Sequence, residues 1–175
     1  MEVEGLWPYW MEEWDAVTVP NSFRMEGMYL LTGPNMAGKS TVQRATCAAV
    51  LLGLCGLTVP ARAASIPRVD MVMLRMGAAD SPAEGHSSFM VEMLDALSIL
   101  RSASGSSLVM VDELGKGTEP DEGAAIAAAV LAALDARGCK GIFATHLYSI
   151  LDLPMDLPGT ARMAMQTEEA EGGGG

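Results

Sequence analysis

The chain has 175 residues, half of them hydrophobic, and a formal net charge of −11 at pH 7. This length and hydrophobic content are typical of one domain with a substantial core, and they exclude a disordered chain. The acidic balance argues against a surface that wraps nucleic acid on its own. No apolar run reaches the length of a membrane span, so we expect no membrane partner.

Residues 1–24 are predicted to form a separate aromatic and acidic segment, which holds Trp7, Trp10 and Trp14. The run at residues 5–10 has two interpretations: a lid or platform for an adenine ring, or a packed edge segment, which we favour. The segment begins with Met1-Glu2-Val3-Glu4, without the basic start of a secretory signal or the Arg and Ser bias of a transit peptide. We therefore expect an intracellular chain that stays where it is made, or one whose true N-terminus is missing.

A glycine-rich loop lies between a predicted strand and a predicted helix. Residues 29–32 are typical of a short buried strand. Residues 40–52 contain no Pro or Gly and place apolar side chains such as Val42 and Ala49 on one helical face. The loop between them fits the pattern G-x-x-x-x-G-K-[ST] of a phosphate-binding P-loop. We expect the following residues to bind the phosphates: Gly33, Pro34, Asn35, Met36, Ala37, Gly38, Lys39, Ser40 and Thr41.

The chemistry of a P-loop assigns roles to these residues. The glycines let successive backbone N–H groups turn toward an anion, and the N-terminus of the following helix adds a favourable dipole. Lys39 is expected to reach the β- and γ-phosphates of ATP, and the Ser40 hydroxyl to hold Mg²⁺. The alternative is a Gly-rich turn that fits the pattern by chance, and the strand and helix on either side argue against it.

Residues 69–76 predict another strand, after an irregular stretch at residues 53–60, and residues 77–85 predict a loop. A second helix follows. Five of its apolar residues have helical spacing and are expected to face the core: Met90, Met93, Leu94, Leu97 and Leu100. Ser87, near the start of this helix, is either part of an anion-binding helix N-terminus or an N-cap, and the residues alone favour the cap.

An apolar strand over residues 107–111 ends in two carboxylates, Asp112 and Glu113. An apolar strand that ends in Asp after a P-loop is the Walker B pattern, in which the Asp supports Mg²⁺. Glu113 is then placed to orient or deprotonate the attacking water. The alternative, two carboxylates at a solvated turn, is disfavoured because a P-loop precedes them.

A helix over residues 123–136, closed by Gly138, precedes a last core strand that ends at His146. His146 is therefore expected at the same sheet edge as Asp112 and Glu113, the carboxyl edge at which open α/β sheets bind ligands. A lone His is usually structural, but at this edge we interpret it as a sensor of the γ-phosphate. Residues 160–166 are compatible with one more strand, and residues 171–175 with a flexible end.

The three cysteines form no C-x-x-C pair, and we expect Cys47, Cys55 and Cys139 to be reduced and buried thiols. Most of the 14 methionines are expected to fill the core.

Four ordered motifs resemble the ATPase domain of the MutS family of DNA mismatch-recognition proteins, over roughly residues 5–164. The motifs are Thr32-Gly33-Pro34-Asn35-Met36-Ala37-Gly38-Lys39-Ser40-Thr41, Gly85-His86-Ser87-Ser88-Phe89-Met90-Val91-Glu92-Met93, Asp112-Glu113-Leu114-Gly115-Lys116-Gly117-Thr118 and Ala144-Thr145-His146. The G-P-N start of the first is narrower than a general P-loop pattern. Residues 5–10 and 80–85 further resemble the organellar branch of this family in plants and algae.

The resemblance implies an α/β P-loop NTPase of the ABC type, with a mainly parallel sheet flanked by helices. It places the ATPase domain at residues 25–154 and a partial C-terminal extension with a flexible Gly tail at residues 155–175. It implies ATP and Mg²⁺ as cofactors. The catalytic residues would be Glu113, His146 and Lys39, and the Mg²⁺ ligands Ser40 and Asp112.

The resemblance also implies partners. The family forms homodimers or heterodimers in which the hydroxyl at Ser87 serves the partner's γ-phosphate, and this overturns the preference for a simple N-cap. ATP hydrolysis would be coupled to mismatched double-stranded DNA through domains absent from this chain. A mitochondrion or chloroplast is the expected location, with the nucleus as an alternative.

Three residues depart from those common in the family: Ala37 replaces Gly, Lys116 replaces Arg and Glu122 replaces Asp. Ala37 is tolerable if its φ is negative, and Lys116 keeps the charge but loses a bidentate fork. Two alternative functions are a nucleotide-binding ABC-type regulatory module and an inactive truncated fragment. A different ABC-type ATPase would carry an L-S-G-G-Q-like run where this chain has Ser87-Ser88-Phe89.

Overall fold

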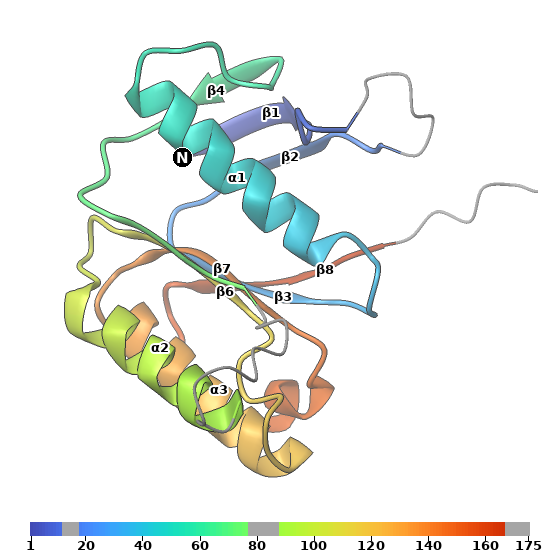
Figure 1. The fold of residues 1–175 in the computed structure, drawn as a ribbon, viewed down its shortest axis with the longest axis vertical. Coiled ribbons are helices and arrows are strands. Elements are labelled where there is room, and N and C mark those ends of the chain that lie inside the picture. The colour runs from blue at the N-terminus through green and yellow to red at the C-terminus, as the bar shows by residue number, and fades with distance from the viewer. Residues whose placement is uncertain (12–17, 77–87, 167–175) are drawn as a thin grey trace, which may run out of the picture.

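A five-stranded parallel sheet forms the centre of the computed structural model, which describes residues 1–11, 18–76 and 88–166 (Figure 1). The strands lie in the order β5-β6-β7-β3-β8, and every neighbouring pair is parallel. Their bounds are β3 Met28–Thr32, β5 Val72–Arg75, β6 Leu108–Asp112, β7 Lys140–Thr145 and β8 Thr160–Ala164. The prediction of an α/β fold with a mainly parallel sheet is confirmed.

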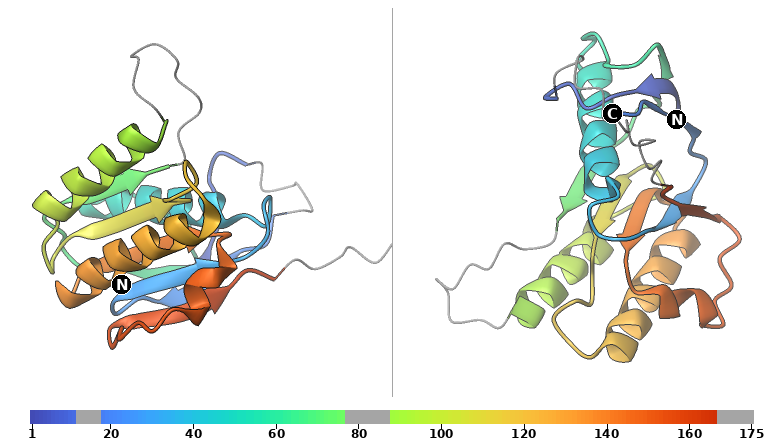
Figure 2. Two further views of the ribbon diagram at one scale, coloured as in Figure 1. Left: turned by 90° about the horizontal axis from the view of Figure 1, so that it is seen from below. Right: turned by 90° about the vertical axis from the view of Figure 1, so that its right-hand side faces the viewer.

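Helices cover both faces of this sheet because its strands are apolar on both sides. Helix α1 (Lys39–Leu54) packs on one face, where Val50 meets Ile142, and α2 (Ser88–Ser102) and α3 (Pro120–Ala136) pack on the other, around Phe143 (Figure 2). A short 3₁₀ helix, η2 (Tyr148–Asp152), follows β7. Within the described ranges, every helix is too short or too polar to span a bilayer.

A second, antiparallel sheet is formed by β1 (Glu2–Leu6), β2 (Asn21–Arg24) and β4 (Ala63–Ser65), in the order β2-β1-β4. Its buried side chains Val3 and Leu6 pack on Ala45 and Ala49 of α1. The first residues of the chain thus pair with a strand some sixty positions later and cover the outer side of α1. Trp7 is half-buried, Tyr9 and Trp10 are exposed, and Trp14 lies outside the described residues.

Helix α1 runs two residues beyond the predicted break, through Gly53 to Leu54. A Cβ at Gly53 would lie 2.5 Å from Cδ1 of Ile66, so the glycine allows the following loop to approach the helix. The prediction that all three thiols are buried is wrong for Cys55, which is exposed directly after this helix.

The predicted core face of α2 is wrong for three of its five residues. Met90, Leu94 and Leu97 are exposed, whereas Met93 and Leu100 are partly buried against the core. The buried residues of the helix are Glu92, Ala96 and Ile99. The helix is rotated because Glu92, a charged residue, has its partners inside the protein: the buried Arg75 and the backbone N–H of Gly115.

Because the core strands are parallel, the loops that follow β3, β6 and β7 leave the sheet at one edge. The loop after β6 packs against the start of α3 through two glycines. A Cβ at Gly115 would lie 2.5 Å from the carbonyl oxygen of Gly123, and a Cβ at Gly123 would lie 2.2 Å from that of Gly115. This close approach holds the loop after β6 against the start of α3.

Candidate active site

The loop between β3 and α1 has a backbone that only particular residues adopt easily. Gly38, the N-cap of α1, has φ 89°, in the left-handed region that favours glycine. Met36 has φ 67° and a fully exposed side chain at the tip of the loop. Ala37 is not among the residues with positive φ, which satisfies the condition for a side chain at that position.

The far end of the chain supports this loop. Strand β8 runs along β3, and the backbone N–H of Met165, directly after β8, donates a 2.8 Å hydrogen bond to the carbonyl of Thr32. The Met165 side chain lies beside the loop, with its methyl carbon 3.5 Å from the position that a Cβ of Gly38 would take.

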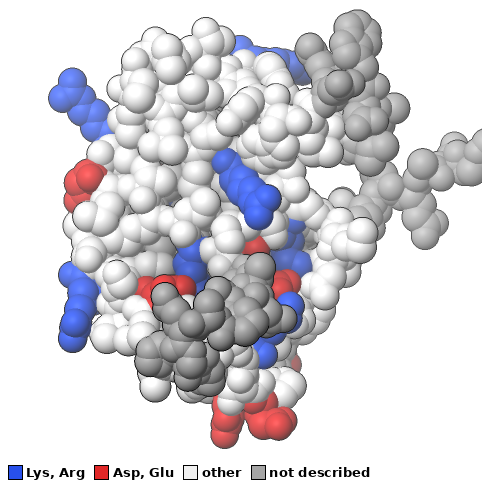
Figure 3. All heavy atoms as spheres, in the orientation of Figure 1, with Lys and Arg blue, Asp and Glu red and all other residues white. Residues whose placement is uncertain are grey.

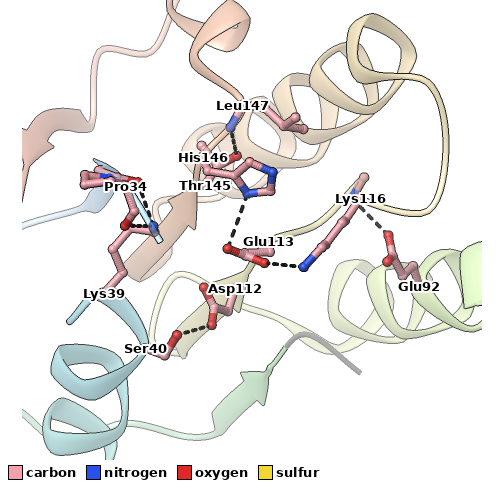
Figure 4. Close-up of polar contacts among 12 residues, drawn as sticks. Pro34, Lys39, Ser40, Glu92, Asp112, Glu113, Lys116, Thr145, His146 and Leu147 are labelled. Atoms are coloured by element: carbon pink, nitrogen blue, oxygen red, sulfur yellow. Dashed lines mark hydrogen bonds and ion pairs between the residues drawn. The ribbon is translucent and has the colours of Figure 1, made fainter. Parts of the chain in front are cut away.

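Lys39, the first residue of α1, is buried under the loop. Its Nζ donates hydrogen bonds of 2.7 Å to the carbonyl of Gly33 and 2.8 Å to the carbonyl of Pro34 (Figure 4). These two bonds hold the ammonium group at the mouth of the loop, where the backbone N–H groups of the loop and the positive end of the α1 dipole add to its charge.

Ser40 joins the loop to the end of β6. Its hydroxyl donates a 2.6 Å hydrogen bond to Oδ2 of Asp112 (Figure 4). The other carboxylate oxygen, Oδ1, is buried and has no hydrogen-bond partner among the described residues. A hydroxyl beside a carboxylate with an unused oxygen is a donor set that fits Mg²⁺, which binds one or two protein oxygens and completes its shell with water and phosphate.

Burial raises the pKa of Asp112 above its usual value, and the charge of Glu113 acts in the same direction. The hydrogen bond from Ser40 and the charges of Lys39 and Arg75 oppose this rise without cancelling it. The ionised carboxylate is therefore disfavoured by folding, and a bound cation would offset that cost.

Replacing Asp112 by Asn is expected to stabilise the metal-free protein at pH 7. An acid whose folded pKa is raised loses stability as the pH rises from its unfolded pKa through its folded pKa. Asp112→Asn removes this loss, and we expect a higher melting temperature at pH 7. Melting curves without Mg²⁺ or nucleotide, recorded over a series of pH values, measure the difference.

The gain should disappear below the usual pKa of an aspartate, about 3.9, where Asp112 is protonated in both states. Asp156→Asn, at an exposed position, is the matched control and should not change the melting temperature. A lower melting temperature for Asp112→Asn at pH 7 would mean that the bond from Ser40 outweighs the effect of burial.

Glu113 follows β6 in a strained conformation, with φ 51°. Its Oε2 accepts a 3.2 Å hydrogen bond from Nζ of Lys116, and its Oε1 lies 3.3 Å from Nδ1 of His146 (Figure 4). Partial burial alone would raise the pKa of Glu113. The hydrogen bond and charge of Lys116, with the charges of His146 and Lys39, outweigh that effect and lower the pKa below its usual value. Glu113 is therefore ionised at neutral pH.

His146 directly follows β7 and is half-buried beside Glu113. Its approach to Glu113 is not aligned as a hydrogen bond. The preceding residue, Thr145, is fully buried, and its hydroxyl accepts a 3.0 Å hydrogen bond from the backbone N–H of Leu147. This turn sends the His146 ring toward Glu113 and away from the core.

Lys39, Ser40, Asp112 and Glu113 border a cavity of about 820 Å³, whereas His146 is not among the residues that line it. One wall is the loop and the first turns of α1, and the opposite wall is the end of β6 with the start of α2. The lining residues include Asn35, Lys39, Ser40, Thr41, Asp112 and Glu113. Figure 3 shows basic and acidic side chains close together near the middle of the face seen in Figure 1. Tyr9 and Trp10 do not line this cavity.

The structure brings the P-loop, Asp112 and Glu113 to one cavity and places His146 beside Glu113. Ser87 lies outside the described residues. Sequence reasoning assigned no role to several residues that line the cavity, among them Arg44 of α1 and Glu92 of α2. Their signal was weak, because a charged residue on a helix usually faces solvent.

Comparison with known proteins places these features in a family. Residues 29–173 match the family model described as MutS domain V. The chain is 46% identical over 172 residues to "DNA mismatch repair protein MSH1, mitochondrial" of Arabidopsis thaliana, which covers 98% of this chain and 15% of that protein. It is 46% identical over 156 residues to "DNA mismatch repair protein MutS" of Sorangium cellulosum, with coverage of 86% and 17%. It is 50% identical over 144 residues to the protein of the same name from Granulibacter bethesdensis, with coverage of 82% and 16%. The chain spans less than a fifth of the length of these relatives.

Proposed function

Because the chain belongs to the MutS family, we propose that it is the ATP-binding and ATP-hydrolysing domain of a DNA mismatch repair protein. The observation that carries the proposal is the hydrogen bond between Ser40 and Asp112. It joins the phosphate-binding loop to the strand end that bears Glu113, with Lys39 at the mouth of the same loop.

Phosphate binding falls to the loop and the start of α1. The backbone N–H groups of residues 33–41 surround the phosphates, and the α1 dipole favours their negative charge. Lys39 exchanges its bonds to the Gly33 and Pro34 carbonyls for bonds to the β- and γ-phosphates. The lysine is already ordered before ATP arrives, so little side-chain entropy is lost on binding.

Ser40 and Asp112 are the residues that would hold Mg²⁺. When bound, the ion neutralises part of the charge that develops on the phosphate oxygens. The unused Oδ1 of Asp112 supports this assignment, since an isolated buried carboxylate oxygen is costly without a partner.

Hydrolysis needs a water molecule aligned with the γ-phosphate. The ionised Glu113 accepts a hydrogen bond from this water and orients its oxygen toward phosphorus. The water oxygen bonds to the γ-phosphorus as the bond from that phosphorus to the bridging oxygen breaks, and ADP leaves with the electron pair. The water proton passes to Glu113 or to the released phosphate. His146, which lies beside Glu113 at the end of β7, acts as the sensor of the γ-phosphate.

The wider role rests on the relatives. We propose that the domain pairs with an identical or related one, and that Ser87 contributes to the γ-phosphate site of the partner. Other domains of the complete protein would bind mismatched DNA and couple it to the nucleotide state. The name of the Arabidopsis relative supports a mitochondrial location; the chloroplast and the nucleus stay predictions from resemblance.

The purified chain is expected to bind MgATP and to hydrolyse it slowly as a monomer, faster as its concentration rises and pairs form. Phosphate release measured over a range of protein concentrations, together with sedimentation, tests this. Fast hydrolysis by a sedimenting monomer, independent of concentration, would contradict the shared site. Binding of MgATP without phosphate release at any concentration would instead favour the regulatory module, and absence of binding would overturn both.

A further inference from the structure

The backbone of Glu113 is strained in the described structure. Its φ of 51° places it in the left-handed region. This conformation is energetically unfavourable for a residue with a long side chain, and it persists only where the surrounding structure enforces it. The strain matters because it sets the direction in which the Glu113 side chain leaves the strand, toward Lys116 and His146.

Two hydrogen bonds hold the peptide group before Glu113, and a third holds the peptide group between Leu114 and Gly115. The carbonyl of Asp112, which belongs to the peptide group before Glu113, accepts a 2.7 Å bond from Nη1 of Arg75. The N–H of Glu113 donates a 3.0 Å bond to the carbonyl of Ala144 in β7. The N–H of Gly115 donates a 3.0 Å bond to Oε2 of Glu92. The chain is thus held directly before the strained residue and again at Gly115, two residues after it.

The two outer bonds come from one buried ion pair. Arg75 at the end of β5 and Glu92 in the second turn of α2 have side chains that are 4% and 8% exposed, and Nη2 of Arg75 lies 3.6 Å from Oε1 of Glu92. Asp95, one turn later on α2, is a third member, with Oδ2 3.8 Å from Nε of Arg75, but its side chain is 49% exposed. Two charges this deeply buried need each other, since either alone would lack compensation.

We propose that Arg75 and Glu92 are positioning residues that hold Glu113 in its strained conformation and thereby direct its carboxylate to the attacking water. The inference rests on the proposed ATP hydrolysis. Neither residue contacts Lys39 or Ser40 in the described structure, whose bonds to the loop and to Asp112 are separate. Glu92 also lines the cavity and Arg75 bonds the Asp112 carbonyl, but the phosphate contacts of the loop and Lys39 do not depend on the pair, so its loss affects mainly the step that uses Glu113.

The test uses Glu92→Ala, which removes both the bond to Gly115 and the charge beside Arg75 while keeping a good helix former in α2. We expect kcat to fall about tenfold to a hundredfold, because a displacement of about 1 Å in a positioned group has an effect of this size, with the KM for MgATP within about twofold of the parent. The amide hydrogen of Gly115 should also exchange faster with solvent, which is a readout independent of activity.

Arg75→Lys is the second variant, because it keeps a positive charge in the buried site but loses the fork that reaches both Asp112 and Glu92. It should lower kcat with unchanged KM in the same way. Asp95→Asn is the matched control, since it removes the exposed partner of the same arginine, and its kcat should stay within about twofold of the parent.

Combination with Glu113→Gln separates positioning from general damage. If Glu92 acts through Glu113, adding Glu92→Ala to Glu113→Gln lowers the single-turnover rate no further. Full additivity of the two losses, or a weakened KM with unchanged kcat, would overturn the inference. The inference would also be overturned if Glu92→Ala and Arg75→Lys hydrolysed ATP as fast as the parent. That result would leave the proposed function intact. A parent without hydrolysis would overturn the proposed function itself.

Discussion

Replacing Glu113 by Gln should leave ATP binding intact and slow hydrolysis by about a hundredfold or more. The amide has nearly the same shape as the carboxylate, but it carries no charge and cannot accept a proton from the attacking water. It also loses the charge attraction to Lys116, so the side chain is less well directed. Phosphate release under saturating MgATP, together with equilibrium binding of a fluorescent ATP analogue, measures both effects.

Glu26→Gln is the matched control for this variant. Glu26 is exposed, pairs only with Arg24 in the described structure, and precedes β3, so it lies at the opposite edge of the sheet from the cavity. Its hydrolysis rate should equal that of the parent. Equal turnover by Glu113→Gln and the parent would remove Glu113 from the mechanism and leave phosphate binding as the only activity supported by the site.

Lys39→Ala should weaken ATP binding by on the order of a hundredfold. A hydrogen bond to a charged group contributes about 1.5–3 kcal/mol, and every 1.4 kcal/mol is a tenfold change in affinity. In the unliganded protein the lysine also holds the loop through the Gly33 and Pro34 carbonyls, so its removal loosens the loop before ATP arrives. Titration with a fluorescent ATP analogue in the presence of Mg²⁺ gives the two dissociation constants.

Lys140→Ala removes a lysine of the same charge at the start of β7, the end of that strand remote from the cavity. Its affinity for ATP should match that of the parent, which excludes a simple effect of net charge. Unchanged affinity in Lys39→Ala would contradict a P-loop function for residues 33–41. Measurements at two salt concentrations separate the local contact from the general field of an acidic protein.

The elements around the cavity were predictable because their signals are local. Residues 29–32 are an apolar run followed at once by glycines and Lys39, and residues 107–111 are an apolar run followed by Asp112. Parallel strands in an α/β sheet must then place their carboxyl ends at one edge, so the meeting of Lys39, Asp112 and His146 follows from connectivity. No side-chain detail is needed for that step.

The orientation of α2 could not be predicted in the same way. Leu94 and Leu97 have the spacing of a core face, yet the helix buries Glu92, whose partners Arg75 and Gly115 are 17 and 23 positions away along the chain. An ion pair between residues far apart in the sequence produces no periodic pattern of apolar residues from which it could be predicted. The one available hint was Arg75, a charged residue in the otherwise apolar run at residues 71–76.

The antiparallel sheet escaped prediction for a related reason. Strand β4 is short and exposed, and its partner β1 lies at the other end of a connection that includes two strands and a helix. The aromatic run at residues 5–10 was interpreted as an adenine platform or a packed edge segment. The feature that indicates the strand is instead the burial pattern that places Val3 and Leu6 against α1.

The position of β8 constrains how such a domain can be shortened or joined to other sequences. Among the described residues, this last strand is the only neighbour of β3 on that side of the parallel sheet. Removing the chain from Thr160 onward would make β3, an apolar strand, an exposed edge strand. Its unpaired peptide groups could then pair with strands of other molecules and promote aggregation. The same cut would withdraw Met165 from Thr32 and Gly38, so a solubility defect and a nucleotide defect would appear together from a single deletion.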